Sequence, residues 1–166
     1  MAKEKKEISL ASAVKVADRV DLQSVKLLAC NCKQKPKRPS GRKAFAMEGN
    51  ARFEVDKEKN LIKVFIRFVL NAFGEEVEPK KENSFLNIEA TFLLLYSINS
   101  VKDLDDAAFS SFAEMNGTYN AWPYWREFVQ SITSRMELPH LTLPVFRIAP
   151  APSRAAAKKK KTPVKS

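Results

Sequence analysis

Residues 61–73 read LIKVFIRFVLNAF, and the alternation in this stretch decides the fold. Successive side chains of a β-strand point to opposite faces, so a period of two predicts a strand with one buried face. The residues of the buried face are Ile62, Val64, Ile66, Phe68 and Leu70. Lys63, Phe65 and Arg67 point to the other face. A sheet with one strongly apolar side is therefore expected here.

Three further stretches with the same period accompany this strand. They cover residues 22–34, 44–55 and 84–98, and connections rich in Pro, Gly, Lys or Asn separate them. Four consecutive strands with such connections predict an antiparallel sheet that buries one face.

Helical spacing replaces the period of two after residue 100. Asp103 or Asp105 can cap a helix with apolar residues at every fourth position, and Gly117 is expected to end it. A second helix is expected to start between Thr118 and Pro123, because proline in a first turn loses no intrahelical hydrogen bond. Its apolar residues recur at three and four positions, as on a buried helix face: Trp122, Trp125, Val129, Ile132 and Met136.

The predicted fold class is α+β, with a four-stranded antiparallel sheet, two C-terminal helices packed on one face and a short N-terminal helix over residues 7–20. Residues 1–20 form an N-terminal segment, and residues 21–148 form one domain. Residues 149–166 are mostly Ala, Pro, Ser and Lys, which predicts a disordered basic tail.

The positive charge of the chain is concentrated in two segments. The net charge is +10, which suggests a nucleic-acid partner until the charge is located. Residues 33–43 and residues 154–166 each carry six basic residues and no acidic ones, so the rest of the chain is slightly negative. The residues expected to make electrostatic contacts are Lys35, Lys37, Arg38, Arg42, Lys158, Lys159, Lys160 and Lys161.

Groups that carry catalysis or bind metals are scarce. His140 is the single histidine, and four glycines leave no Gly-rich phosphate loop. Cys30 and Cys32, without a nearby histidine, make a poor metal site, and free thiols are expected. We therefore expect no enzyme, no cofactor and no metal site. No apolar run approaches the roughly 18 residues of a membrane span, and a signal-peptide core is missing, so a cytoplasmic protein is expected.

Apolar side chains are also expected on the second face of the sheet. They are Phe65, Val69, Phe85, Leu93 and Leu95. A small monomer with apolar residues on both faces would expose larger patches than monomers usually tolerate. Self-association, or binding of extended apolar segments from another chain, would cover them.

Residues 119–146, YNAWPYWREFVQSITSRMELPHLTLPVF, resemble the closing region of the SecB-type export chaperones. The shared pattern is an aromatic-Pro-Tyr-x-Arg-Glu start at residues 122–127, a helix that ends in Arg135, and a Pro-x-Leu-x-Leu stretch at residues 139–143. The order of strands and helices agrees with that family over roughly residues 20–148. The sequence looks most like divergent SecB-like members, including those linked to toxin–antitoxin systems.

The resemblance implies a dimer of dimers that holds non-native polypeptides without ATP, in grooves lined by aromatic and aliphatic side chains. Members dedicated to translocation pass the client to the SecA motor. The candidates for the client groove are Phe45, Met47, Phe53, Trp122, Tyr124, Trp125, Leu141 and Leu143. The three aromatic residues of the helix are expected to line the groove or to pin the helix to the sheet, and Arg126 and Glu127 to make local pairs.

The sequence also departs from the family. Familiar members are acidic, and their acidic sheet surface docks the zinc-containing tail of SecA. Here Lys63 and Arg67 lie among the acidic residues of the outer face, and the tail is polybasic, which weakens the case for SecA docking. The expected function is an ATP-independent holdase for unfolded or nascent polypeptides, with SecA or a toxin–antitoxin protein as a further partner. The alternative is a nucleic-acid- or anionic-surface-binding protein that acts through residues 33–43 and the lysine tail.

Overall fold

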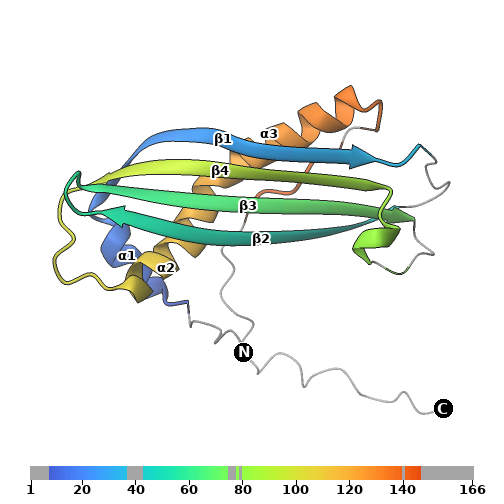
Figure 1. The fold of residues 1–166 in the computed structure, drawn as a ribbon. Coiled ribbons are helices and arrows are strands. Elements are labelled where there is room, and N and C mark those ends of the chain that lie inside the picture. The colour runs from blue at the N-terminus through green and yellow to red at the C-terminus, as the bar shows by residue number, and fades with distance from the viewer. Residues whose placement is uncertain (1–7, 37–42, 75–77, 79, 140, 147–166) are drawn as a thin grey trace, which may run out of the picture.

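The computed structural model describes residues 8–36, 43–74, 78, 80–139 and 141–146, which form a long four-stranded antiparallel sheet with helices on one face (Figure 1). The strands are β1 (Val20–Gln34), β2 (Lys43–Asp56), β3 (Leu61–Gly74) and β4 (Leu86–Ile98), with a short 3₁₀ turn, η1 (Lys81–Asn83), before β4. Their order across the sheet is β1-β4-β3-β2, so β1 and β2 are the edges. The predicted fold class is confirmed, and the four strands lie where the alternation predicts them.

The register between the strands brings the apolar residues of one face into rows. Phe68 of β3 lies between Gly49 of β2 and Ala90 of β4, for example. On β3 and β4 this face is almost completely buried under the helices, whereas its residues on the two edge strands are less covered. A slip of one residue would turn Lys63 and Arg67 toward the helices, so the pattern fixes the register strongly.

Two short helices pack together at one end of the sheet. α1 (Leu10–Ala17) confirms the predicted N-terminal helix, and its N-cap Ser9 accepts a hydrogen bond from the Ser12 N–H at 3.3 Å. The Ser9 N–H donates to Ser111 Oγ at 3.2 Å, which ties α1 to α2 (Asp106–Phe112). Asp105 caps α2 by accepting from the Ala108 N–H at 2.8 Å. Of the two predicted caps, Asp105 is therefore the one used.

The predicted helix end at Gly117 is wrong. α2, a π-helical turn η2 (Ala113–Gly117) and α3 (Thr118–Arg135) run on without a break, and Gly117 has helical angles of φ −59 and ψ −48. Glycine serves close packing here, because a Cβ at this position would lie 2.7 Å from Cγ1 of Val64. Gly117 therefore allows the helix to pack close against Val64 of β3.

Pro123 lies inside the continuous helix and not in its first turn, contrary to prediction. A proline nitrogen cannot donate to the carbonyl four residues earlier, which here belongs to Tyr119. Tyr119 and Pro123 are both exposed, so water can reach this side of the helix and bond the free carbonyl.

Aromatic rings connect the helix to the centre of the sheet. The Trp125 ring stacks on Phe68 with centroids 5.3 Å apart, and Trp122 meets the same ring edge-on at 5.6 Å. Tyr96 meets Phe112 edge-on at 5.1 Å. Such pairs contribute about 0.5–1.5 kcal/mol beyond the apolar area that they bury.

The buried hydroxyl of Tyr96 is expected to make the stability of the fold depend on pH in the alkaline range. Its side chain is 2% exposed, its hydroxyl accepts from Asn120 Nδ2 at 3.0 Å, and burial raises its pKa from 10.0 to about 12. Because the unfolded chain loses this proton first, the stability contributed by neutral Tyr96 is complete below pH 10 and is lost as the pH rises toward 12. The free energy of unfolding should fall by up to about 1.4 kcal/mol per pH unit in this window.

Urea unfolding of wild type and Tyr96→Phe between pH 10 and 12 measures this effect. Phenylalanine has no proton to lose, so the variant should show a shallower decline than wild type. The same decline in both proteins would contradict the assignment.

Candidate functional site

The end of α3 turns the chain back along the sheet. Glu137 has a φ of 54, in the left-handed region. Its N–H donates to the Ser134 carbonyl at 3.1 Å, and the Leu138 N–H donates to the Thr133 carbonyl at 2.9 Å. This pair of bonds is the Schellman ending of a helix, in which glycine more often occupies the left-handed position. The turn directs residues 138–139 and 141–146, the returning segment, back past α3.

Two donors on α3 hold the returning segment. Trp122 Nε1 donates to the Pro144 carbonyl at 2.9 Å, and Arg126 Nε donates to the Leu143 carbonyl at 2.8 Å. These two residues are four apart and so lie on one side of the helix. Arg126 therefore bonds to a backbone carbonyl and not to the local acidic partner expected from the sequence. The motif that carries the family resemblance fixes the C-terminal segment.

Replacing Arg126 by methionine should loosen this segment. Methionine keeps most of the side-chain length but cannot donate, so we expect a loss of about 1 kcal/mol and hydrogen exchange about five-fold faster at residues 141–146. Arg135→Met, at an exposed position in the last turn of α3, is the matched control and should leave this exchange unchanged. Equal effects of the two variants would contradict the holding role of Arg126.

An apolar pocket of about 300 Å³ lies where β2 and β4 begin, beside the end of α3 and the returning segment. The residues that line it are Lys43, Phe45, Phe85, Leu86, Thr133, Leu138, Pro139 and Leu141. The Thr133 hydroxyl donates to the Val129 carbonyl at 2.8 Å, so its polar atom is satisfied within the helix. Lys43 is the one charged residue in this lining. The pocket can accept a large apolar side chain.

Three of the predicted groove residues lie at this pocket or beside it. Phe45 of β2 and Leu141 of the returning segment both line it. Met47, two residues after Phe45 on the same face of β2, is also exposed, and its sulfur accepts from Trp125 Nε1 at 3.4 Å. The open surface of the pocket thus continues along the edge strand.

The other predicted groove residues lie elsewhere. Trp122, Trp125 and Leu143 are buried in the core, where the two tryptophans pin α3 to the sheet. Phe53 is half-buried against the core. Tyr124 is 47% exposed on α3 and does not line the pocket.

Six residues of the lining are not among the predicted groove residues: Lys43, Phe85, Leu86, Thr133, Leu138 and Pro139. The sequence contains a signal that could have identified Lys43 as a lining residue. It lies two residues before Phe45 and so points to the same face of β2. Leu138 and Pro139 adjoin the predicted Leu141. Phe85 and Thr133 reach the pocket only through tertiary packing, for which the local pattern gives no signal.

Most residues predicted to make electrostatic contacts lie outside the described residues. Lys35 is described, and its Nζ donates to the Glu82 carbonyl at 2.6 Å. The others are Lys37, Arg38, Arg42, Lys158, Lys159, Lys160 and Lys161, and His140 also lies outside the described part.

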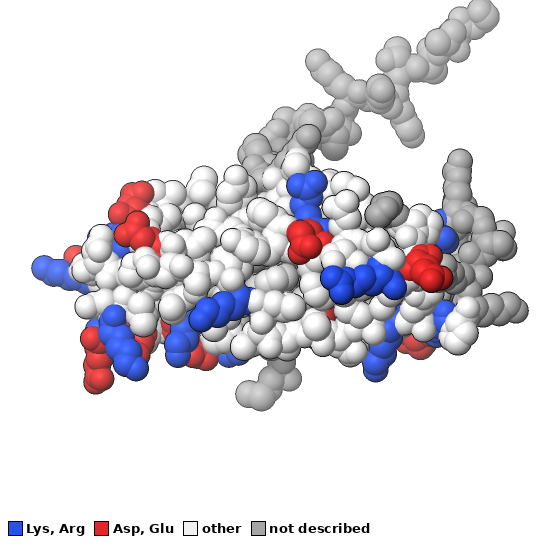
Figure 2. All heavy atoms as spheres, turned by 90° about the horizontal axis from the view of Figure 1, so that it is seen from above, with Lys and Arg blue, Asp and Glu red and all other residues white. Residues whose placement is uncertain are grey.

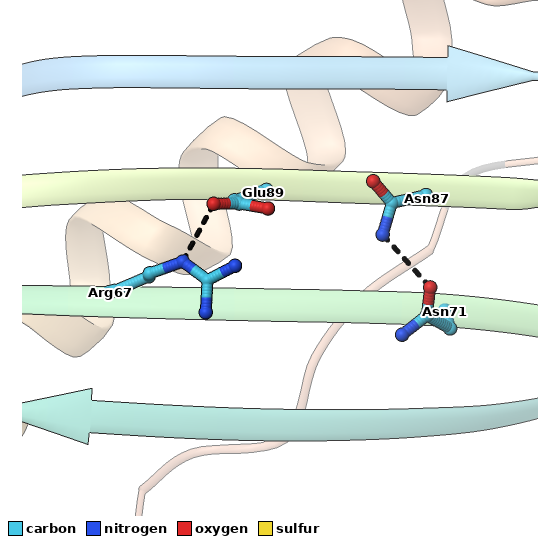
Figure 3. A network of polar contacts seen from close by, with 4 residues as sticks. All are labelled: Arg67, Asn71, Asn87 and Glu89. Carbon is cyan, nitrogen blue, oxygen red and sulfur yellow. Dashed lines mark hydrogen bonds and ion pairs between the residues drawn. The ribbon is translucent and has the colours of Figure 1, made fainter. Parts of the chain in front are cut away.

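The face of the sheet away from the helices carries a polar network (Figure 3). Arg67 Nε and Glu89 Oε1 form an ion pair at 2.6 Å, and Asn87 Nδ2 donates to Asn71 Oδ1 at 2.8 Å. The charge of Arg67 is thus balanced by its neighbour on β4.

The expectation of large exposed apolar residues on this outer face is wrong for Phe65, Val69 and Phe85, which are buried, whereas Leu93 and Leu95 are half-buried. The Phe65 side chain is 8% exposed, and the Arg52 guanidinium covers its ring at 3.7 Å from the centroid. Val69 is also buried. The long stems of neighbouring polar side chains can cover apolar groups in this way.

Six of the large apolar residues that are exposed in the described part of the chain lie on β1, on α1 or just before it. They are Ile8, Leu10, Val14, Leu22, Leu27 and Leu28. Figure 2 looks onto the side where β1 forms the sheet edge, and shows a broad uncharged surface with basic and acidic residues interspersed around it. No large patch of a single sign appears among the residues drawn as described.

Cys30 and Cys32 are free thiols on β1, as predicted. Burial raises the pKa of Cys32, and the neighbouring Cys30 raises it further. Within the described ranges, no three acidic, histidine or cysteine residues come close enough to hold a metal ion. No helix in that part of the chain is long and apolar enough to cross a membrane.

Comparison with known proteins places the fold. No family model and no curated protein matches this sequence. Among solved structures, the SecB-like chaperone Rv1957 of Mycobacterium tuberculosis, in complex with a ChAD peptide from the antitoxin HigA1 (Rv1956), aligns with a TM-score of 0.74 and 20% identity, over 85% of this chain and 99% of that chain. A protein of unknown function from Streptococcus agalactiae aligns more weakly, with a TM-score of 0.45 and 10% identity, over 75% of this chain and 96% of that chain. This chain therefore has the fold of the SecB-like chaperones, as the resemblance of residues 119–146 predicts.

Proposed function

We propose that this protein is an ATP-independent chaperone that holds extended, non-native polypeptides. The observation that carries the proposal is the open apolar pocket at residues 43, 45, 138, 139 and 141, in a fold shared with a chaperone solved in complex with a peptide. The pocket lies next to β2, an edge strand. An extended client can therefore place a side chain in the pocket and pair its backbone with the strand edge.

The physical chemistry of the pocket suits binding of many sequences. Burial of apolar area contributes about 25 cal/mol per Å² without directional requirements, so a leucine or phenylalanine contributes about 1.5–3 kcal/mol. One such anchor is too weak by itself, and useful affinity needs several anchors along one client. Met47 beside the pocket adds a flexible apolar surface that adapts to different side chains.

Several anchors on one client require several copies of the pocket, so the proposal includes self-association. The exposed apolar residues of α1 and the free edge of β1 support it, because an unpaired strand edge with exposed leucines favours pairing with another chain. We propose a homo-oligomer built as a dimer of dimers, acting in the cytoplasm. Protein export is one setting for it, and capture of one dedicated partner is another.

Among specific partners, we favour an antitoxin-type polypeptide over SecA. The neighbour in the structural comparison was solved with an antitoxin peptide. The outer sheet face supports the same choice. Glu89 there is paired with Arg67, and Lys63 adds a further positive charge, so this surface lacks the strong acidity that docks SecA in the family.

Nucleic-acid binding has weaker support. On the face shown in Figure 2, the charges of the described residues are interspersed and do not form the basic stripe that such proteins use. The basic loop and tail remain available for weak attraction to anions, which salt would screen.

Calorimetric titration of a permanently unfolded polypeptide, such as reduced and alkylated α-lactalbumin, tests the proposal. The titration is run at moderate and high salt, with the full chain and with a variant that lacks residues 149–166. Salt-resistant binding by both proteins, with a negative heat-capacity change, is expected of an apolar groove. Absence of binding, or binding that salt or removal of the tail abolishes, would overturn the proposal in favour of a charge-driven binder.

A further inference from the structure

We infer that the pocket binds most tightly those client segments in which a carboxylate lies two residues from a large apolar side chain, and that Lys43 is the residue that binds the carboxylate. This inference rests on the proposed function and adds a chemical preference to it. The apolar side chain occupies the pocket, and the client carboxylate pairs with the Lys43 ammonium.

Lys43 has the position that this role requires. It lines the pocket together with Phe45, the residue two positions further along β2. Residues two apart on a strand are separated by roughly 6.6 Å and point to the same face. A client strand that runs alongside β2 has the same repeat, so its residues two apart face Phe45 and Lys43 together. The spacing of the two lining residues therefore sets the spacing expected in the client.

The Lys43 ammonium is open to an acidic partner. Its Nζ lies 5.8 Å from the centre of the Phe85 ring, at the outer limit of a cation–π contact. The ion pairs formed between described residues join other cations to acids: Arg52 to Glu54, Lys59 to Asp56, Arg67 to Glu89, and Lys80 to Glu78. Lys43 takes part in none of these four pairs.

The surroundings of Lys43 strengthen an ion pair formed there. The residue is half-buried, and the rest of the lining is apolar except for Thr133, whose hydroxyl is already bonded within α3. A client carboxylate beside an apolar anchor therefore meets the Lys43 ammonium in a setting less hydrated than the open surface. The attraction between the two charges is stronger there than on the open surface. Glu137 precedes the lining residue Leu138 but does not itself line the pocket. A lysine at the same place in the client would face a like charge.

Three synthetic peptides with one apolar core test this preference by calorimetry. They differ only in the residue two positions from the central phenylalanine, which is aspartate, asparagine or lysine. Wild type should bind the aspartate peptide about five-fold more tightly than the asparagine peptide and the lysine peptide most weakly, as one partly buried ion pair predicts. A fourth peptide with the aspartate moved by one position should behave like the asparagine peptide.

Two variants with the same loss of charge assign the preference to one residue. Lys43→Met should bind the aspartate and asparagine peptides equally, whereas Lys102→Met, beyond the opposite end of β4, should keep the wild-type preference. Equal affinities in wild type, or the same loss of preference in both variants, would overturn the role of Lys43 and leave the chaperone proposal standing. Binding of none of the peptides, by a wild type that is folded by circular dichroism, would overturn this inference. If the unfolded polypeptide also fails to bind, the proposed function fails with it.

Discussion

Trp125→Ala should cost the fold about 3–5 kcal/mol and leave the protein largely unfolded on mild heating. The Trp125 side chain is 0% exposed, stacks on Phe68 at 5.3 Å and donates to Met47 Sδ at 3.4 Å. Its removal leaves a cavity between α3 and the sheet that the neighbouring rings cannot fill. A domain of this size has about 5–15 kcal/mol of stability in total, so one such change removes a large part of it.

Chemical denaturation of Trp125→Ala and Tyr124→Ala measures the effect with a matched control. The adjacent Tyr124 is 47% exposed on the same helix, so its replacement should change the free energy of unfolding by less than about 0.5 kcal/mol. Similar losses in the two variants would mean that Trp125 does not pin α3 to the sheet.

Gly117→Ala should destabilise the fold by about 1–3 kcal/mol, although alanine normally favours a helix over glycine. The added Cβ would lie 2.7 Å from Cγ1 of Val64 and 3.2 Å from Cδ1 of Ile66, so the helix has to move away from β3. The propensity gain of about 1 kcal/mol is too small to offset the displaced contacts along the helix.

Gly49→Ala is the matched control for this prediction. Its added Cβ would meet only the Phe68 ring at 3.6 Å, which is ordinary contact, so we expect no loss of stability. The double variant Gly117→Ala with Val64→Ala removes the methyl group that makes the shortest contact, Val64 Cγ1, and tests its role. If Gly117→Ala alone proved as stable as wild type, the close approach of η2 to β3 would be contradicted.

The strands could be predicted from the sequence because their signal is local. A period of two in residues 61–73 depends only on which face is buried, and β3 has that face buried as predicted. Gly117 and Pro123 misled prediction because both residues commonly mark helix boundaries. Their roles here are set by tertiary structure: one by the closeness of β3, the other by exposure to water at that turn.

The candidate site could be predicted only in part, for the same reason. Phe45 and Leu141 stand out in sequence as apolar residues in a predicted strand and in a predicted extended segment. Composition alone groups Lys43 with the other basic residues of the segment 33–43. The structure shows instead that it begins β2 and lines the pocket. Trp125 and Tyr124 are both aromatic, but the spacing of three and four residues places Trp125 and not Tyr124 on the apolar face of the helix, and the structure buries Trp125 and exposes Tyr124.

The central claim is that clients bind at the pocket and not on exposed aromatic surface in general. Phe45 and Tyr124 are matched for a direct test, because they are 48% and 47% exposed and only Phe45 lines the pocket. Calorimetric affinity for the unfolded polypeptide should fall about ten-fold in Phe45→Ala, as for loss of one buried aromatic anchor, and stay at the wild-type value in Tyr124→Ala. Unchanged affinity in Phe45→Ala, or an equal loss in both variants, would contradict the claim.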